Sequence, residues 1–215
     1  MIMGTEEDDG VEVDRMVKNI IFDMGRVLVT FDPVQYVNSL GFDEETARAV
    51  VVAIFHNPLW TETDRGVIPV EEFEDAFVAN APKYETQIRK AYREMGRIIQ
   101  LMPHTMPWVK ELKERGYRLY VLSNYGEYLF LQSKDRLDFM PYMDGAVISY
   151  QIQMIKPDQE IYEYLLNKYG LLPEECVFID DRPENVEAAK AIGMSGIQFV
   201  DYEQANGELE KMLAR

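Results

Sequence analysis

The stretch that decides the fold is VKNIIFD, residues 17–23. It is a short apolar run that ends in an acid. A strand buried on both faces of a parallel sheet has this continuous hydrophobic pattern instead of an alternating one. We therefore expect a central strand with Asp23 at its carboxyl end. Because open parallel sheets bind ligands beyond the carboxyl ends of their strands, Asp23 is also the first candidate functional residue.

The segment that follows, residues 34–100, has the pattern of consecutive helices. A glycine ends PVQYVNSLG (33–41), and an acidic first turn precedes the apolar face of DEETARAVVVAIFH (43–56). Two more helical patterns follow at residues 70–80 and 84–101. Because no strand pattern interrupts this segment, we predict a helical subdomain inserted after the first strand.

From Met102 onward, strand patterns alternate with helix patterns. The expected strands are YRLYVLS (117–123), AVISY (146–150), CVFID (176–180) and GIQFV (196–200). Such alternation predicts a parallel sheet covered by helices on both faces. The predicted fold class is therefore α/β, with a doubly wound, Rossmann-like parallel-sheet core at residues 16–33 and 101–215. The helical insertion occupies residues 34–100.

The charge of the chain limits its partners. There are 38 Asp and Glu against 22 Lys and Arg, a formal net charge of −16, and residues 1–15 form an expected acidic tail. This charge argues against nucleic acid or an anionic membrane as a partner, whereas a small phosphorylated substrate needs only a local cationic site. No segment has the length and hydrophobicity of a membrane span. Cys176 is the only cysteine, so we expect a reducing, cytoplasmic location.

Polar residues follow the predicted strands at Asp23, Ser123 and Asn124. A carboxylate at the position of Asp23 can attack phosphorus and form an acyl phosphate, or it can cap a turn that Gly25 allows to bend tightly. The Ser123 hydroxyl and the amides beside Asn124 can hold the oxygens of a phosphoryl group, but Ser-Asn is also an ordinary loop sequence. Taken alone, each of these segments leaves both interpretations open.

A lysine and a pair of acids complete the candidate set. Lys156 can neutralise both a phosphate and the attacking carboxylate, or it can be an exposed residue before a helix that starts at Pro157. Asp180 and Asp181 end an apolar strand, where two adjacent acids are costly unless a cation compensates them. Magnesium is the natural compensating ion, because it binds one or two carboxylates together with waters and a substrate phosphate. The alternative for this acidic pair is a helix cap before Pro183.

The four motifs FDMG, LSN, KP and IDDRPEN, in this order, resemble those of the haloacid dehalogenase superfamily. The resemblance covers almost all of the chain from Val17 onward, and the helical insertion resembles the cap of its class I members. FDMGRVLVTFD and the cap segment DRGVIPVEEF (64–73) are most similar to a subgroup that includes bacterial sugar-phosphate phosphatases. The resemblance implies a magnesium-dependent phosphatase that acts on a small phosphorylated metabolite.

The resemblance also implies a role for each motif residue. Asp23 is the nucleophile, and Ser123 and Lys156 bind the phosphoryl group. The metal site consists of Asp23, the Gly25 carbonyl and Asp181 as the most direct ligands, with Asp180 as a direct or an outer ligand. Magnesium is the implied cofactor.

One position departs from the family pattern. Most phosphatases of this family carry a second Asp two residues after the nucleophile, where this chain has Gly25. A general acid contributes about 10²–10⁴-fold to the rate, so its absence predicts slow turnover or reliance on good leaving groups, unless an acid from the cap replaces it. Arg26 either adds a charge for phosphate binding or pairs with the acidic surface.

Two other functions remain open at this point. A true haloacid dehalogenase also lacks the second Asp, but Asp180 and Asp181 would repel its carboxylate substrate. A degenerate binding or regulatory protein would have no reason to keep the nucleophile, the lysine and the acidic pair together.

Overall fold

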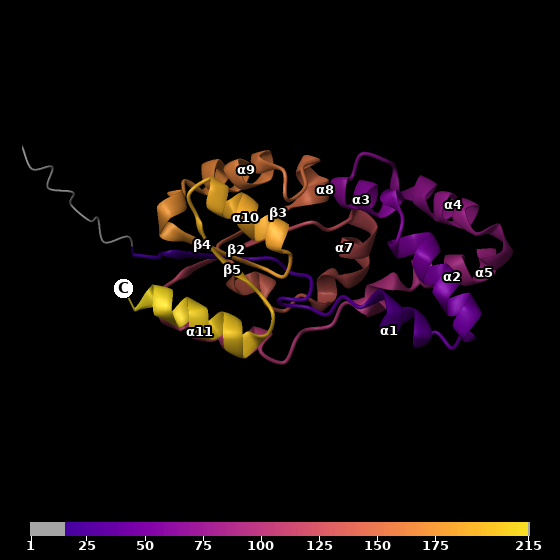
Figure 1. Cartoon of the computed structure of the whole chain (residues 1–215), viewed down its shortest axis with the longest axis horizontal. Coiled ribbons are helices and arrows are strands. Elements are labelled where there is room, and N and C mark those ends of the chain that lie inside the picture. Colours follow the sequence, from indigo (N-terminus) through magenta and orange to yellow (C-terminus); the bar gives the residue numbers. More distant parts are fainter. Residues whose placement is uncertain (1–15, 215) are drawn as a thin grey trace, which may run out of the picture.

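The structure of the protein is a computed structural model that describes residues 16–214. The acidic tail expected at residues 1–15 lies outside the described residues. Figure 1 shows two parts, a sheet flanked by helices and a group of helices at the other end of the molecule. No helix within residues 16–214 is long and apolar enough to cross a membrane.

Five strands form one parallel sheet in the order β3-β2-β1-β4-β5. The strands are β1 (Asn19–Phe22), β2 (Arg118–Ser123), β3 (Gly145–Ile148), β4 (Cys176–Asp180) and β5 (Ser195–Gln198). The apolar sequence of β1 suits its central position, where all four of its residues are shielded from solvent. The predicted fold class, a doubly wound parallel sheet, is confirmed.

Two predicted strands have different ends in the structure. The strand expected at residues 146–150 ends at Ile148, because Ser149 begins the short helix α8 (Ser149–Ile152). The strand expected at residues 196–200 ends at Gln198, which is paired with Asp180, the last residue of β4. Beyond that pair only the Phe199 backbone N–H still reaches β4, where it donates to the Asp180 carbonyl at 2.9 Å.

Helices cover both faces of the sheet (Figure 1). On one face lie α6 (Thr105–Glu114) and α11 (Tyr202–Leu213), and on the other lie α9 (Gln159–Tyr169) and α10 (Pro183–Ala191). The side chains of successive β1 residues point to opposite faces of the sheet. Phe22 meets Trp108 of α6 with ring centroids 5.0 Å apart, while Ile21 packs in the cluster that contains Tyr162 of α9. The remaining connections contain α7 (Glu127–Ser133) and the 3-10 turns η3 (Lys134–Arg136), η4 (Met140–Tyr142) and η5 (Pro173–Glu175).

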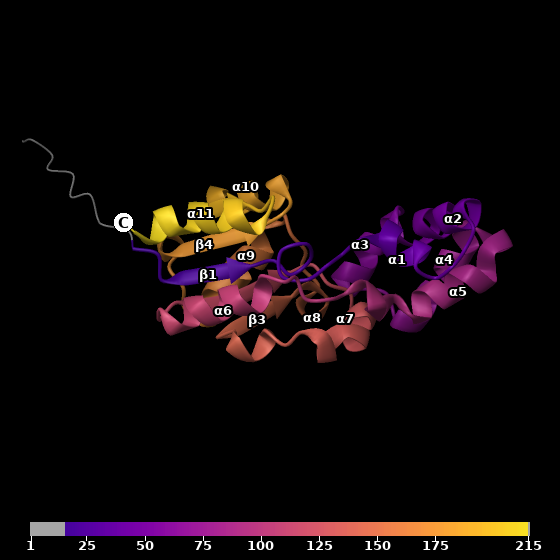
Figure 2. The ribbon, with the colours of Figure 1, turned by 90° about the horizontal axis from the view of Figure 1, so that it is seen from below.

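Between β1 and α6 the chain is mostly helical, and these helices gather beyond the carboxyl ends of the strands (Figure 2). Apolar residues from several of its helices, including Ile54, Phe77 and Ile88, are completely buried. The elements are α1 (Pro33–Asn38), α2 (Glu44–Phe55), α3 (Pro58–Arg65), α4 (Val70–Asn80), η1 (Pro82–Tyr84), α5 (Glu85–Arg93) and η2 (Met95–Ile98).

The single helix expected at residues 84–101 is wrong. The helix ends at Arg93, and the chain continues through η2 to Leu101, which forms an antiparallel bridge with Val29. Gly96 explains the break, because it weakens a helix and lies directly against α7. A Cβ atom on Gly96 would come within 2.7 Å of the Gln132 carbonyl oxygen.

Candidate active site

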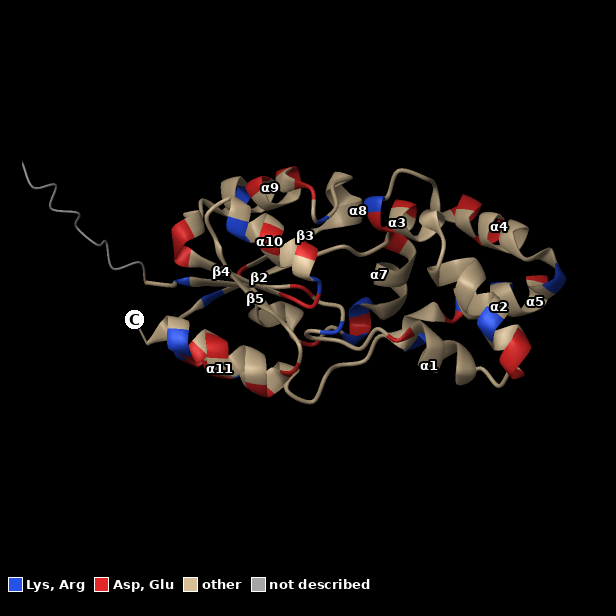
Figure 3. Ribbon diagram, viewed as in Figure 1, with Lys and Arg blue, Asp and Glu red and all other residues tan. Residues whose placement is uncertain are grey.

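The three central strands bring their polar ends together. Phe22 is level with Val121 of β2 and with Ile179 of β4, so Asp23 follows β1 between Ser123 and Asp180. Acidic and basic segments meet in the loops at this edge of the sheet (Figure 3). The candidate site therefore lies where the topology predicts a ligand, beyond the carboxyl ends of the strands.

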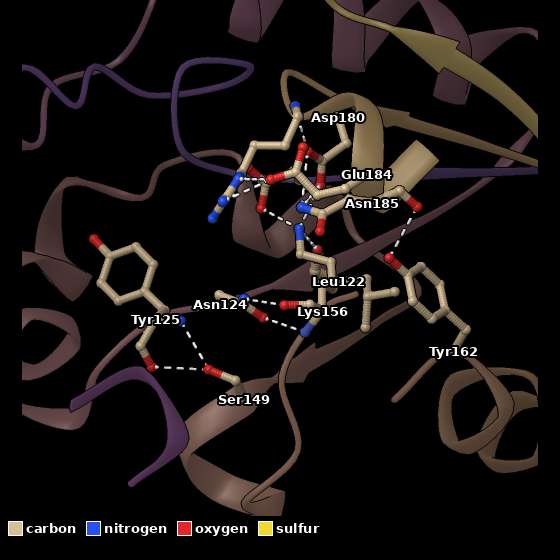
Figure 4. Close-up of polar contacts among 11 residues, drawn as sticks. Leu122, Asn124, Tyr125, Ser149, Lys156, Tyr162, Asp180, Glu184 and Asn185 are labelled. Carbon is tan, nitrogen blue, oxygen red and sulfur yellow. Dashed lines mark hydrogen bonds and ion pairs between the residues drawn. The ribbon is translucent and has the colours of Figure 1, made fainter. Parts of the chain in front are cut away.

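Lys156 is the centre of this cluster (Figure 4). Its Nζ donates to Asp23 Oδ1 at 2.7 Å, to Asp180 Oδ2 at 2.6 Å and to the Leu122 carbonyl at 2.9 Å. Only 1% of the lysine side chain is exposed. Burial by itself would lower the pKa of Lys156, but the carboxylates of Asp180 and Asp23 outweigh burial and raise it. The lysine therefore stays charged and holds the two acids in place.

Asn124 fixes the loop that carries Lys156. Its Oδ1 accepts the backbone N–H of Lys156 at 2.8 Å, and its Nδ2 donates to the Lys156 carbonyl at 2.9 Å (Figure 4). The Asn124 side chain is thus engaged with the lysine backbone, and the predicted contact of substrate with the backbone amides beside Asn124 stays a prediction. This pair of hydrogen bonds places a residue 32 positions away beside β2.

Asp180 is completely buried and its oxygens are well occupied. Oδ1 accepts the Arg182 backbone N–H at 2.8 Å, and both oxygens accept from Asn185 Nδ2 at 3.0 Å, in addition to the bond from Lys156. Sequence reasoning assigned no role to Asn185, although it lies within the quoted RPEN segment. The available signal was an amide in the first turn of the helix that follows Asp180, because α10 places Asn185 next to the end of β4.

Asp181 is the more accessible member of the acidic pair. Its side chain is 20% exposed and lies 3.5 Å from Arg26 Nη1. Burial and then the neighbouring Asp180 raise the pKa of Asp181, and Arg26 opposes them. Arg26 was expected either to bind phosphate or to pair with an acid of the surface. The geometry matches an ion pair, and its partner, Asp181, belongs to the candidate site.

Asp23 has one engaged oxygen and one that faces Gly25. Oδ1 accepts from Lys156, while Oδ2 lies 3.8 Å from the place where a Cβ atom of Gly25 would stand. Burial, partly offset by Lys156, raises the pKa of Asp23 to about 6. Nearby, the buried Ser123 hydroxyl forms no well-aligned hydrogen bond among residues 16–214, although it is close enough to Asp23 to lower the pKa of that carboxyl. A buried hydroxyl in this position is available to donate a hydrogen bond to a ligand oxygen.

Three carboxylates converge closely enough to share a metal ion. One oxygen from each of Asp23, Asp180 and Asp181 lies within 4.8 Å of the others. The raised pKa values of Asp23 and Asp181 show that the nearby cations compensate these charges incompletely. A bound cation would supply the missing positive charge, so the residues present fit a metal site.

Comparison with known proteins agrees with this geometry. The family model of haloacid dehalogenase-like hydrolases matches residues 17–193. The chain belongs to this hydrolase family. It is 27% identical over 196 residues to a sesquiterpene phosphatase of Aspergillus oryzae, named astK, covering 91% of this chain and 96% of that protein. It is 24% identical over 193 residues to a D-ribitol-5-phosphate phosphatase of Bacteroides thetaiotaomicron, covering 85% and 92%.

The fold also matches a solved structure of the family. A HAD family enzyme of Bacteroides thetaiotaomicron, in complex with magnesium and inorganic phosphate, superposes with a TM-score of 0.66 and 22% identity. The match covers 84% of this chain and 93% of that one. The parallel sheet flanked by helices is therefore the fold of this hydrolase family.

The turn after Asp23 differs from the sequence prediction. Gly25 was expected to provide the conformational freedom, but the left-handed residue is Arg26, with a φ of 60°. Arg26 is held in this conformation by its backbone N–H, which donates to the Val29 carbonyl at 2.7 Å, and by its Nε, which donates to the Phe31 carbonyl at 3.1 Å. Gly25 instead leaves open space on the Oδ2 side of Asp23.

The hydrolase has a further acid that sequence reasoning missed. Asp64, in the last turn of α3, is half-buried and close enough to the site for its charges to act on the Asp64 carboxyl. Burial and then the negative charge of Asp23 raise the pKa of Asp64 to about 7. The available signal was the segment DRGVIPVEEF, whose first residue is Asp64.

Proposed function

We propose that this hydrolase is a magnesium-dependent phosphatase that removes phosphate from a small metabolite through an aspartyl-phosphate intermediate on Asp23. The observation that carries the proposal is the arrangement around Asp23. A buried lysine neutralises one oxygen, a buried serine hydroxyl without a well-aligned hydrogen bond lies beside it, and two more carboxylates stand within metal-binding distance.

The proposed first step is attack of Asp23 Oδ2 on phosphorus. A P–O bond forms to Asp23 while the bond to the leaving-group oxygen breaks, and that oxygen must acquire a proton. Lys156 and the Ser123 hydroxyl would hold non-bridging oxygens of the transferring group. Water then attacks the aspartyl phosphate, which releases inorganic phosphate and restores the carboxylate of Asp23.

Asp23, Asp181 and the Gly25 carbonyl would hold the magnesium ion. Asp180, whose oxygens already accept hydrogen bonds from Lys156, Arg182 and Asn185, would add negative charge behind them. When bound, the ion supplies positive charge that offsets repulsion between the phosphate and the carboxylates. The related enzyme solved with magnesium and phosphate supports this choice of cofactor.

The substrate belongs to the same proposal. The names of the relatives point to phosphate monoesters, including the sugar-alcohol phosphate D-ribitol 5-phosphate, so a sugar phosphate is the first class to test. We further propose that residues 34–100 act as a cap that selects this substrate. Their helices stand beyond the carboxyl ends of the strands, over the site (Figure 2).

The decisive experiment is hydrolysis of 4-nitrophenyl phosphate with and without magnesium. We expect activity that excess chelator removes and magnesium restores, followed by turnover of members of a sugar-phosphate panel. Intact-protein mass spectrometry of a quenched reaction should show one added phosphoryl group, which Asp23→Asn removes. Chelator-resistant release of halide from a 2-haloacid would instead identify a dehalogenase. Inactivity on every ester would contradict the phosphatase proposal.

A further inference from the structure

The leaving-group oxygen needs a proton, and the core offers no free donor for it. Gly25 stands where most phosphatases of the family have an acid. Lys156 directs its three N–H groups at Asp23, Asp180 and Leu122. Asp180 is buried within its own hydrogen bonds, and Asp181 pairs with Arg26 at the expected metal site. Among residues 16–214, a donor supplied by the protein therefore has to come from outside this cluster.

Helix α3 brings an acid to this place through close backbone contacts. A Cβ atom on Gly126 would lie 3.1 Å from the Thr63 carbonyl oxygen, and one on Gly66 would lie 2.8 Å from the Tyr150 carbonyl oxygen. Only glycine permits such contacts without displacing the backbone. The end of α3 is thus pressed against the loop after β2 on one side and against α8 on the other.

A hydrogen-bond relay fixes the backbone of Asp64 itself. The Ser149 hydroxyl donates to the Asp64 carbonyl and accepts the backbone N–H of Tyr125 at 2.8 Å. Figure 4 shows Tyr125 and Ser149 joined in this way, next to Asn124 and Lys156. Tyr125 is two residues beyond Ser123, so Asp64 is tied to the loop that carries the phosphoryl-binding serine.

The carboxyl group of Asp64 has the properties of a proton donor. It forms no ion pair with any described residue between 16 and 214. The groups acting on it are Asp23, Lys156, Arg182 and the Gly126 backbone N–H, all of which belong to the site or its adjoining loops. Burial, with Asp23 next, raises its pKa to about 7, so it exchanges protons readily near neutral pH.

We propose that Asp64 is the general acid and base of this hydrolase, supplied by the cap in place of the acid missing at Gly25. Asp64 gives its proton to the leaving-group oxygen as Asp23 displaces it. Asp64 then takes a proton from the water that attacks the aspartyl phosphate, which restores its starting state. The proposal rests on the proposed phosphatase activity.

The test compares wild type with Asp64→Asn on 4-nitrophenyl phosphate, phenyl phosphate and an alkyl phosphate. Asparagine keeps the shape of aspartate and a carbonyl oxygen for the Gly126 N–H, but it has no acidic proton. We expect kcat/KM to fall about 10²–10⁴-fold for the alkyl ester and only slightly for the nitrophenyl ester, whose leaving group needs no proton. A burst of nitrophenolate should appear, because hydrolysis of the aspartyl phosphate also loses its base.

Two further variants keep the test specific. Asp64→Glu retains the acid and should recover part of the alkyl phosphatase activity. Glu62→Gln removes a neighbouring carboxylate that pairs with Arg65 on the same helix, and it should behave as wild type. Circular dichroism checks that each variant is folded.

The outcomes separate the two proposals. If Asp64→Asn lowers kcat/KM equally for all three esters, or leaves all three unchanged, Asp64 is a docking residue and this inference is overturned while the phosphatase stands. If wild type hydrolyses none of the esters with magnesium present, the proposed function fails and the role of Asp64 fails with it.

Discussion

Replacing Lys156 with methionine tests whether one buried cation holds the site together. The substitution keeps the length of the side chain but removes an ammonium that bonds Asp23 at 2.7 Å and Asp180 at 2.6 Å. These side chains are 11% and 0% exposed, so solvent cannot take over the role of the lysine. Removing one partner from a buried ion pair costs about 3–5 kcal/mol. We expect a loss of this size at pH 8 in metal-free buffer.

The loss should depend on pH in a defined direction. Without the lysine, the pKa of Asp23 in the folded variant rises further above its unfolded value, because Lys156 is the main group that lowers it. Protonation then favours the folded state, and this contribution is lost as the pH rises through the folded pKa. The free-energy difference between wild type and variant should therefore grow from pH 5 to pH 8.

The assay is urea unfolding followed by the fluorescence of Trp60 and the buried Trp108. Lys113→Met is the matched control, because Lys113 lies 2.7 Å from Asp144 but both side chains are about one-third exposed, at 30% and 34%. Exposed pairs contribute only about 0.2–1 kcal/mol. If the two variants lose equal stability at pH 8, the reasoning from burial is refuted.

Three other predictions concern catalysis. Asp23→Asn should lower kcat by at least about 10³-fold with the fold retained, and substantial residual turnover would exclude Asp23 as the nucleophile. In magnesium titrations of activity, Asp180→Ala should weaken half-activation by about 10–100-fold and Asp181→Ala by more, since only Asp181 is a proposed direct ligand. The reverse order would exchange their roles. Gly25→Asp should restore at least about tenfold of the alkyl phosphatase activity lost in Asp64→Asn, because its Cβ atom has only Asp23 Oδ2 at 3.8 Å and Phe31 Cβ at 3.9 Å nearby. Gly25→Asn, which has the same shape without the acid, should restore none of it.

Short-range patterns made much of this protein readable from its sequence. The run that ends at Asp23 predicted the central strand, because a strand buried on both faces consists mainly of apolar residues. CVFID predicted β4 for the same reason, and the order of strands and helices then placed Asp23, Ser123 and Asp180 at one edge of the sheet. The four motifs also gave the family, which the match over residues 17–193 confirms.

The contacts that complete the site join residues far apart in the chain. Sequence reasoning identified no partner for the Asn124 side chain, which holds the backbone of Lys156. It also assigned no role to Asn185, which bonds both oxygens of Asp180. A sequence pattern states which face of an element is apolar, but it does not state which distant side chain fills a given hydrogen bond. That partner is determined when the elements pack.

Asp64 shows the same limit most clearly. In the sequence Asp64 is one of 38 Asp and Glu residues, and nothing in its local helical pattern distinguishes it from the others. Its raised pKa and its place beside the loop after β2 arise because Gly66 and Gly126 let α3 approach the core. The sequence by itself predicted the parallel α/β core, the position of Asp23 at the end of its first strand and the absence of an acid at Gly25. Only the tertiary structure decided which acid stands nearby, because burial and proximity to Asp23 exist only after the helical insertion has packed against the sheet.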